Sequence, residues 1–208
     1  MNNMKIDDIL ATYPIISDQV DIKELTVLLR ELEAVLRSGG RGSVVEFGCY
    51  VGTTSLFIRR LLDAYNFAGE FHVYDSFAGL PEKTSQDNSA VGEQFKAGEL
   101  LAPRKNFINN FKKAGLRMPT IHKAWFSDLT PEDVPENIKF AFFDGDFYES
   151  IADSFHVCED KFSEGAVVIV DDYANEALPG AQRAVDDWCR RRGRGIDRVE
   201  ASLAIIRL

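Results

Sequence analysis

The segment SVVEFGCYVGTT, residues 43–54, carries a signal for a strand, a turn and a helix in succession. Its first five residues form a short apolar run that predicts a buried strand, which Gly48 closes. Thr53 and Thr54 are suited to begin a helix, which continues with apolar residues at helical spacing. Glycines at 48 and 52 permit a tight connection between the two elements. We therefore predict a strand that turns directly into a helix.

The same alternation continues on both sides of this unit. Further strands are predicted at 71–75, 120–125, 138–143 and 166–170, with a terminal hairpin at 198–208. Further helices are predicted at 21–38, 103–115, 148–162 and 181–191. Strands that alternate with helices form a mostly parallel sheet covered on both faces. The sequence thus predicts an α/β fold with a doubly wound, mostly parallel, seven-stranded sheet.

The chain length of 208 residues suits one domain, residues 1–208, with a sizeable core. Residues 1–40 are expected to hold a short N-terminal helical segment. Residues 76–102 interrupt the alternation with a mostly polar stretch that contains several glycines. Long loops inside a compact domain are usually functional or disordered. We expect this stretch to form a lid over the ends of the strands.

The composition of the chain limits the kinds of partner that it can bind and the cellular compartment in which we expect it. The net charge of −9 argues against binding to nucleic acid, which requires a basic surface. No apolar run is long enough to span a bilayer, and the first residues, MNNMKIDDIL, lack the pattern of a secretion signal. The three cysteines are widely spaced, so they predict neither a disulfide framework nor a zinc site. We expect a cytoplasmic protein that acts on a small molecule.

The glycine loop predicts a nucleoside ligand without phosphates. A dinucleotide fingerprint has a second glycine where this chain has Tyr50, and Glu46 would repel a pyrophosphate. S-adenosylmethionine (SAM) carries an ammonium and a sulfonium, which favour an acidic neighbour. Gly48 and Gly52 would let the backbone approach such a ligand, with Thr53 at the start of the following helix. A plain structural turn is the alternative for this glycine pattern.

Residues at the ends of the next two strands extend this prediction. Asp75 ends the second strand, where nucleotide-binding α/β folds place the carboxylate that accepts hydrogen bonds from ribose hydroxyls. Capping of the following turn is its alternative role. Trp125, Phe126 and Ser127 follow the third strand and could flank and bond the adenine, although core packing would also account for the two aromatic residues.

Three aspartates predict a metal site. Asp144 ends one strand, and Asp171 and Asp172 end the next. Unpaired carboxylates at one sheet edge would repel one another, and a set of oxygen ligands favours Mg²⁺. Such an ion could lower the pKa of an acceptor hydroxyl, with Asp144 as the proton acceptor.

Nearby polar residues have structural interpretations. Asp146 and Glu149 resemble a capping box at the start of the helix at 148–162. A turn cap before Asn175 is the alternative role for Asp172. His72 is expected in the core, and His122 and His156 are weaker candidates for a catalytic base.

The motifs VVEFGCYVGTTS, VYDSFAGLPE, FAFFDGDFYES, VVIVDDY and AVDDW together resemble the macrocin O-methyltransferase family, the TylF-type sugar methyltransferases of natural-product pathways. The resemblance runs from Ser43 to Trp188. It implies a class I, Rossmann-like methyltransferase fold with SAM and Mg²⁺ as cofactors, and a sugar hydroxyl beside a second hydroxyl as acceptor. It also implies contacts of SAM with Ser76 beside Asp75.

Three alternatives stay open. An aromatic diol could be the acceptor, as in catechol-type O-methyltransferases. A nicotinamide dehydrogenase could share the sheet, and a SAM-binding protein could lack catalysis. Membership in this family would be compatible with a homo-oligomer. The sequence does not determine the number of subunits.

Overall fold

The computed structural model describes residues 6–39 and 42–208. Seven strands form one sheet in the order β3-β2-β1-β4-β5-β7-β6. Their bounds are β1 Ser43–Phe47, β2 Phe71–Asp75, β3 Thr120–Lys123, β4 Ile138–Phe143, β5 Phe162–Val170, β6 Arg198–Glu200 and β7 Leu203–Arg207. The first five are parallel, and β7 runs antiparallel to both β5 and β6. The predicted seven-stranded α/β fold and its terminal hairpin are therefore confirmed.

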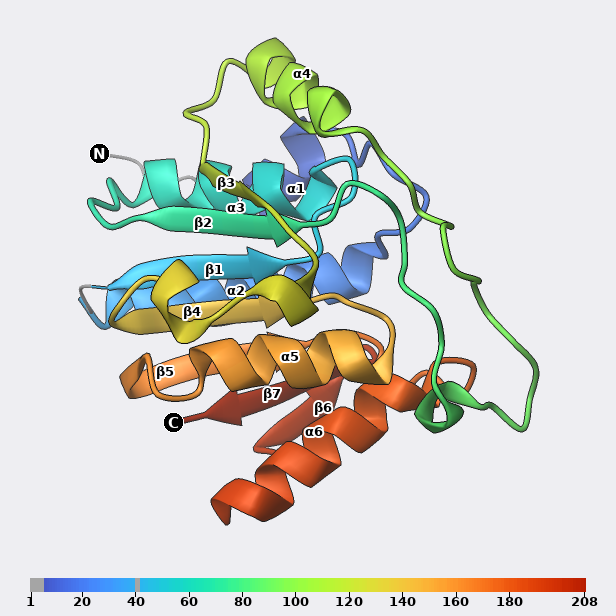
Figure 1. Cartoon of the computed structure of the whole chain (residues 1–208). Helices are drawn as coiled ribbons and strands as arrows, with labels where there is room; N and C mark the ends of the chain where they lie inside the picture. Colours follow the sequence, from blue (N-terminus) through green and yellow to red (C-terminus); the bar gives the residue numbers. More distant parts are fainter. Residues whose placement is uncertain (1–5, 40–41) are drawn as a thin grey trace.

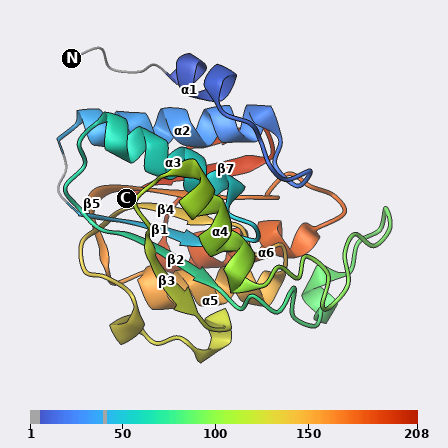
Figure 2. The same ribbon diagram turned by 90° about the horizontal axis from the view of Figure 1, so that it is seen from above.

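Helices cover the sheet on both faces (Figure 2). Helices α1 to α4 pack on one face, with bounds α1 Ile6–Thr12, α2 Ile22–Arg37, α3 Thr53–Ala64 and α4 Arg104–Ala114. Helices α5 Tyr148–Cys158 and α6 Pro179–Arg192 pack on the other face. Both cores consist of aliphatic and aromatic side chains from alternate positions of the strands. This double layer explains why the central strands are apolar on both faces.

The predicted boundaries are wrong at the junction between α5 and β5. Helix α5 ends at Cys158 rather than Phe162, and β5 begins at Phe162 rather than Ala166. The early part of β5 is polar, but Gly165 donates a backbone hydrogen bond to the carbonyl oxygen of Leu208 at 2.6 Å. Pairing between strands thus extends β5 beyond the apolar run that the sequence displays.

The N-terminal region contains two helices in its described part. Asp21 caps α2 by accepting a hydrogen bond from the backbone N–H of Lys23. Residues 1–5 and Gly40, to which the predicted N-terminal segment also extends, lie outside the described residues. No helix within the described ranges is long and apolar enough to cross a membrane.

Residues 76–102 pass over the carboxyl ends of the strands (Figure 1). The stretch contains one 3-10 helix, η1 Ser85–Asp87. Asp87 is 3% exposed, and its Oδ1 accepts a hydrogen bond from the backbone N–H of Tyr148 at 2.7 Å. A Cβ at Gly180 would lie 1.9 Å from the same oxygen, so glycine is required where the segment meets α6. The segment is therefore docked on the starts of α5 and α6.

Candidate active site

A cavity of about 220 Å³ lies at the carboxyl ends of β1, β2, β4 and β5. Its walls include parts of the 76–102 segment and of the connection between α1 and α2. Open α/β sheets bind ligands at this place, where the strand order reverses. The predicted site residues in its lining are Glu46, Gly48, Tyr50, Thr53, Asp75, Ser76, Trp125, Phe126, Ser127, Asp144, Asp171 and Asp172.

Gly48 follows the end of β1 directly and lies against Asp144, which follows the end of β4. Its φ is 85°, and an added Cβ would lie 1.8 Å from the backbone oxygen of Asp144. Gly52, by contrast, does not line the cavity. Its φ is 90°, and an added Cβ would lie 2.8 Å from Cδ2 of Phe107. The two glycines thus differ in role: Gly48 brings backbone to the cavity, whereas Gly52 lets α4 pack against the turn.

Glu46 presents an unsatisfied carboxylate oxygen. The side chain is 0% exposed, and Oε2 accepts a hydrogen bond from Oγ of Ser55 at 2.5 Å. Within the described residues, Oε1 has no hydrogen-bond partner, and neither has the buried Oγ1 of Thr53. Burial raises the pKa of Glu46 to about 8, the Ser55 hydrogen bond opposes this, and the charge of Asp75 adds to it. A ligand ammonium would supply the missing partner for this buried group.

Asp75 holds the glycine loop in place. Its Oδ2 accepts hydrogen bonds from the backbone N–H groups of Cys49 at 2.9 Å and Tyr50 at 3.0 Å. Oδ1 accepts from the backbone N–H of Phe77 at 2.7 Å, which is the alternative turn-capping role. A carboxylate can accept about four hydrogen bonds, so ribose hydroxyls remain compatible with these contacts.

The aromatic residues after β3 form one end of the cavity. Trp125 is 37% exposed and precedes the 3-10 helix η2, Phe126–Asp128, so the predicted strand ends two residues early. The ring of Phe126 packs edge-on against Phe47, with centroids 5.3 Å apart. Packing in the core therefore accounts for one face of Phe126, while Trp125 is free to stack on a ligand.

The predicted metal ligands gather at the ends of β4 and β5. Burial and the charges of Asp171, Asp146, Asp172 and Glu46, in that order, raise the pKa of Asp144 well above its usual range. Burial and the charges of Asp172 and Glu24 raise that of Asp171 likewise. The cavity lining contains no lysine, arginine or histidine among the described residues. The negative charge at this edge is therefore uncompensated.

These carboxylates fit Mg²⁺ by chemistry but are not converged around a point. Among residues 6–39 and 42–208, no group of three or more His, Cys, Asp or Glu side chains is arranged to hold a metal ion. Asp172 is also engaged elsewhere, because its Oδ1 accepts a hydrogen bond from Nδ2 of Asn175 at 2.9 Å. An all-oxygen, negatively charged donor set is nevertheless the kind that Mg²⁺ prefers.

The capping-box interpretation of Asp146 is wrong. The N-cap of α5 is Phe147, and it has no side-chain cap. Asp146 instead has a left-handed φ of 59° and lines the cavity. It is 7% exposed, and burial and the charge of Asp172 raise its pKa to about 8. Its place in the DGD motif, two residues after Asp144, was the available signal that it belongs to the site.

One residue that was not predicted lines the cavity, and two candidate histidines do not. Glu24 of α2, which the sequence did not single out, lines the cavity, and burial followed by the charges of Asp172 and Asp21 raises its pKa to about 7. His122 and His156 do not line it. His122 instead stacks on His72 with ring centroids 5.3 Å apart. All three cysteines are free and buried.

Known proteins resemble this chain over most of its length. The model of the macrocin-O-methyltransferase (TylF) family matches residues 15–202. The 8-demethyl-8-(2,3-dimethoxy-alpha-L-rhamnosyl)-tetracenomycin-C 4'-O-methyltransferase of Streptomyces olivaceus is 34% identical over 181 residues, 84% of this chain and 68% of that protein. The mycinamicin III 3''-O-methyltransferase of Micromonospora griseorubida is 30% identical over 190 residues, 87% of this chain and 74% of that protein.

Solved structures of methyltransferases share the fold of this chain. The O-methyltransferase NovP matches with a TM-score of 0.76 and 25% identity, over 90% of this chain and 80% of that one. The fold is also that of the calicheamicin methyltransferase CalS11, with a TM-score of 0.70 at 18% identity, over 99% of this chain and 90% of that one. The sheet order, the cavity at its switch point and these relatives define a class I, SAM-dependent methyltransferase. This chain belongs to the macrocin O-methyltransferase (TylF) family and is an O-methyltransferase. A nicotinamide dehydrogenase is thereby excluded.

Proposed function

We propose that this enzyme methylates a hydroxyl of a sugar attached to a natural product, at a position beside a second hydroxyl, with Mg²⁺ at the carboxylate edge. The observation that carries the proposal is the juxtaposition, in one cavity, of the unsatisfied Glu46 oxygen with the uncompensated Asp144, Asp171 and Asp172. The first would receive the ammonium of SAM and the second a metal. The tetracenomycin relative is named for methylation of a rhamnosyl compound, and the mycinamicin relative for 3''-O-methylation of mycinamicin III.

The remaining contacts to SAM would come from the rest of the cavity. Asp75 would accept hydrogen bonds from the ribose hydroxyls, beside Ser76, and Trp125 would stack on the adenine with Ser127 at its edge. Gly48 and Tyr50 would present backbone to the ligand, and Thr53 would bond the methionine end. Each of these residues lines the same cavity, so one extended ligand can reach them all.

The chemistry is an in-line displacement at carbon. The acceptor oxygen forms a bond to the methyl carbon, the bond from that carbon to sulfur breaks, and the sulfonium becomes the neutral thioether of S-adenosylhomocysteine (SAH). The hydroxyl proton leaves to a carboxylate. Mg²⁺ held by Asp144, Asp171 and Asp172 would lower the pKa of the bound hydroxyl and orient it.

Asp144 or Asp146 would take the proton. Asp144 is the residue predicted from the sequence, and it would combine this role with metal binding. Asp146 is 7% exposed, lines the cavity and has no hydrogen bond in the described part of the chain, so its carboxylate is free to accept one. Separate substitutions distinguish the two residues, because only Asp144 is assigned to the metal.

The test is methyl transfer from SAM to a panel of acceptors, followed by mass spectrometry of the product. The panel contains a rhamnosyl glycoside with adjacent hydroxyls, the same glycoside lacking one of them, and a catechol. We expect transfer to the intact glycoside in Mg²⁺ and its loss in EDTA. Transfer to the catechol alone would favour an aromatic diol, and undiminished transfer in EDTA would contradict the role of the metal.

Two variants complete the test. Asp144→Asn should abolish both Mg²⁺ binding and turnover. Asp146→Asn should retain Mg²⁺ binding and lose roughly 10²–10⁴-fold in turnover if it is the proton acceptor. SAH binding without turnover on any diol would indicate a SAM-binding protein without catalysis.

A further inference from the structure

Asn175 connects the carboxylate edge to the 76–102 segment. It lies in the turn that follows β5. Its Nδ2 donates to Oδ1 of Asp172 at 2.9 Å and to Oε1 of Gln94 at 3.4 Å. Its own Oδ1 accepts a hydrogen bond from the backbone N–H of Ala177 at 3.0 Å. One amide group therefore bonds its own turn, a candidate metal ligand and the segment above the cavity.

Gln94 is part of the cavity wall. Gln94 and its neighbour Phe95 both line the cavity. The backbone oxygen of Gln94 accepts a hydrogen bond from Nζ of Lys83 at 2.8 Å, so the outgoing and returning parts of the segment are joined at this residue. A continuous path of hydrogen bonds thus runs from Lys83 through Gln94 and Asn175 to Asp172.

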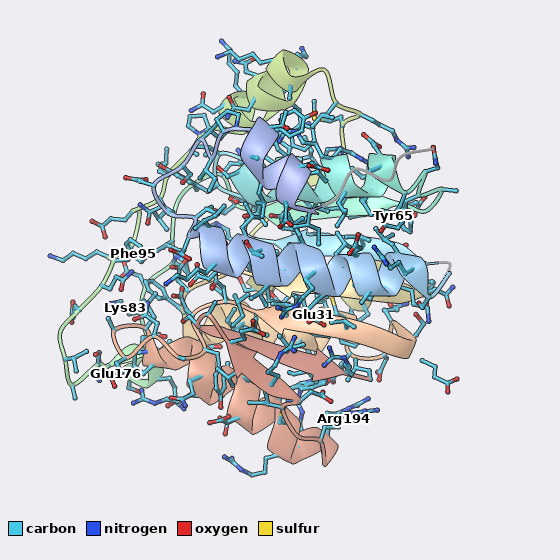
Figure 3. All side chains as sticks on the ribbon, turned by 180° about the vertical axis from the view of Figure 1, so that it is seen from behind. Glu31, Tyr65, Lys83, Phe95, Glu176 and Arg194 are labelled. Atoms are coloured by element: carbon cyan, nitrogen blue, oxygen red, sulfur yellow. The ribbon has the colours of Figure 1, made fainter. Side chains whose placement is uncertain are left out.

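The second contact between the segment and this turn lies outside the cavity. Oγ of Ser89 donates to the backbone oxygen of Glu176 at 2.7 Å. In Figure 3, Lys83, Phe95 and Glu176 lie along the same edge of the molecule. Ser89 and Glu176 do not line the cavity, whereas Gln94 and Asp172 do. The contact made by Asn175 is therefore the one that faces the ligand side.

We propose that Asn175 is a positioning residue, which fastens the cavity wall at Gln94 and Phe95 over the acceptor and orients Asp172 beneath it. This role rests on the proposed function, because it assigns the carboxylate edge to the acceptor. The amide can serve both neighbours because each of its two N–H groups can donate to a different oxygen. Loss of the amide would free the wall from the floor of the cavity without removing a group that contacts the methyl donor.

The test compares Asn175→Ser with Ser89→Ala. A serine oxygen can still cap the turn at Ala177 but cannot reach Asp172 and Gln94. Ser89→Ala removes the hydrogen bond between the segment and Glu176, which lies outside the cavity. Trypsin cleavage after the exposed Lys96 reports opening of the segment. The KM and kcat for the acceptor, and the Kd for SAH, report the consequences at the site.

Asn175→Ser should raise the rate of cleavage after Lys96 roughly three- to tenfold, the factor expected for one lost hydrogen bond. It should raise the acceptor KM by a similar factor and leave the Kd for SAH within about twofold. Ser89→Ala should accelerate cleavage without raising the acceptor KM. Wild-type cleavage and wild-type KM in Asn175→Ser would overturn the proposal.

Measurements with and without Mg²⁺ distinguish the positioning role of Asn175 from the proposed metal site. Both proteins are digested with Mg²⁺ and with EDTA. Faster cleavage and a raised KM in the variant, with no effect of Mg²⁺ on wild-type binding or activity, would support the role of Asn175 and contradict the metal. Metal-dependent turnover of the wild type, together with wild-type cleavage and wild-type KM in Asn175→Ser, would support the metal and contradict the role of Asn175.

Discussion

The phenol oxygen of Tyr148 lies 3.0 Å from Oδ2 of Asp187, and that of Tyr173 lies 3.0 Å from Oδ1 of Asp186. Two adjacent carboxylates of α6 thus accept hydrogen bonds from the first residue of α5 and from the turn after β5. Tyr148 follows the loop that carries Asp144, and Tyr173 follows the end of β5. The AVDDW motif of α6 therefore has a physical explanation: it anchors the two loops that supply the candidate metal ligands.

Tyr148→Phe should lower the free energy of unfolding by roughly 0.5–1.5 kcal/mol, because one hydrogen bond is lost and Asp187 keeps its exposed pairing with Arg190. It should also reduce turnover, since the loop before α5 loses its anchor. Urea unfolding and methyl transfer measure the two effects. Tyr65→Phe is the control, because Tyr65 bonds Glu33 and Arg37 away from the cavity. Equal turnover in both variants would refute the anchoring role.

Glu46→Gln should stabilise the ligand-free protein at alkaline pH. The pKa of Glu46 is raised from 4.5 to about 8, so the folded state holds a proton that the unfolded state releases. Stability therefore falls as pH rises through the window from 4.5 to about 8. Glutamine removes this penalty, which we expect to be on the order of 1–3 kcal/mol at pH 8. Urea unfolding at pH 5 and pH 8 measures the difference.

The same substitution should weaken SAH binding roughly 10- to 100-fold, because the ligand ammonium loses a charged acceptor. Calorimetry in buffers with different ionisation enthalpies should show proton release when SAH binds the wild type near pH 7, and none in the variant. Unchanged SAH affinity in Glu46→Gln would show that the ammonium lies elsewhere.

The bounds of a strand or helix could be predicted from the sequence where its apolar residues match the positions that are buried. Strand β4 was predicted at its observed bounds, Ile138–Phe143, because both of its faces are buried and its residues are nearly all apolar. The start of β5 was missed, because Phe162 and Ser163 are only partly buried, Glu164 and Gly165 are exposed, and all four owe their strand conformation to pairing with neighbouring segments. Hydrogen bonds between distant segments leave no trace in a local pattern.

The site residues that end strands could be predicted from the sequence, whereas those in other elements could not. Asp144, Asp171 and Asp172 end buried strands, so topology alone brings them to one edge. Asp146 was misassigned, since Asp-x-x-Glu before a helix fits a capping box equally well, and only the left-handed φ of 59° turns it toward the cavity. Glu24 and Asn175 come from elements whose position over the sheet is set by tertiary packing.

Gly48→Ala should prevent folding or abolish SAH binding. The added Cβ would lie 1.8 Å from the backbone oxygen of Asp144, so β1 and β4 would have to separate. Gly115→Ala is the matched control, because its φ is 65° and no atom of residues 6–39 and 42–208 lies within 4 Å of its Cβ position. The control should cost only about 1–2 kcal/mol for the left-handed conformation. Circular dichroism and SAH calorimetry distinguish the two, and a folded, SAH-binding Gly48→Ala would contradict the predicted close approach.

Asp171→Asn should stabilise the metal-free protein and abolish its response to Mg²⁺. The carboxyl is buried beside Asp172 and Glu24, whose charges oppose its ionisation, so a neutral amide relieves the repulsion. In the wild type, Mg²⁺ at about 100 times its Kd should raise the free energy of unfolding by about 2.7 kcal/mol. Asp153→Asn removes another cavity carboxylate whose nearest charges are Glu149 and His156, so its response to Mg²⁺ should be retained. Urea unfolding of the three proteins with and without Mg²⁺ measures these responses. If Asp171→Asn and the wild type gained equally from Mg²⁺, the ion would be bound away from this edge, and the carboxylates would need another role in the transfer.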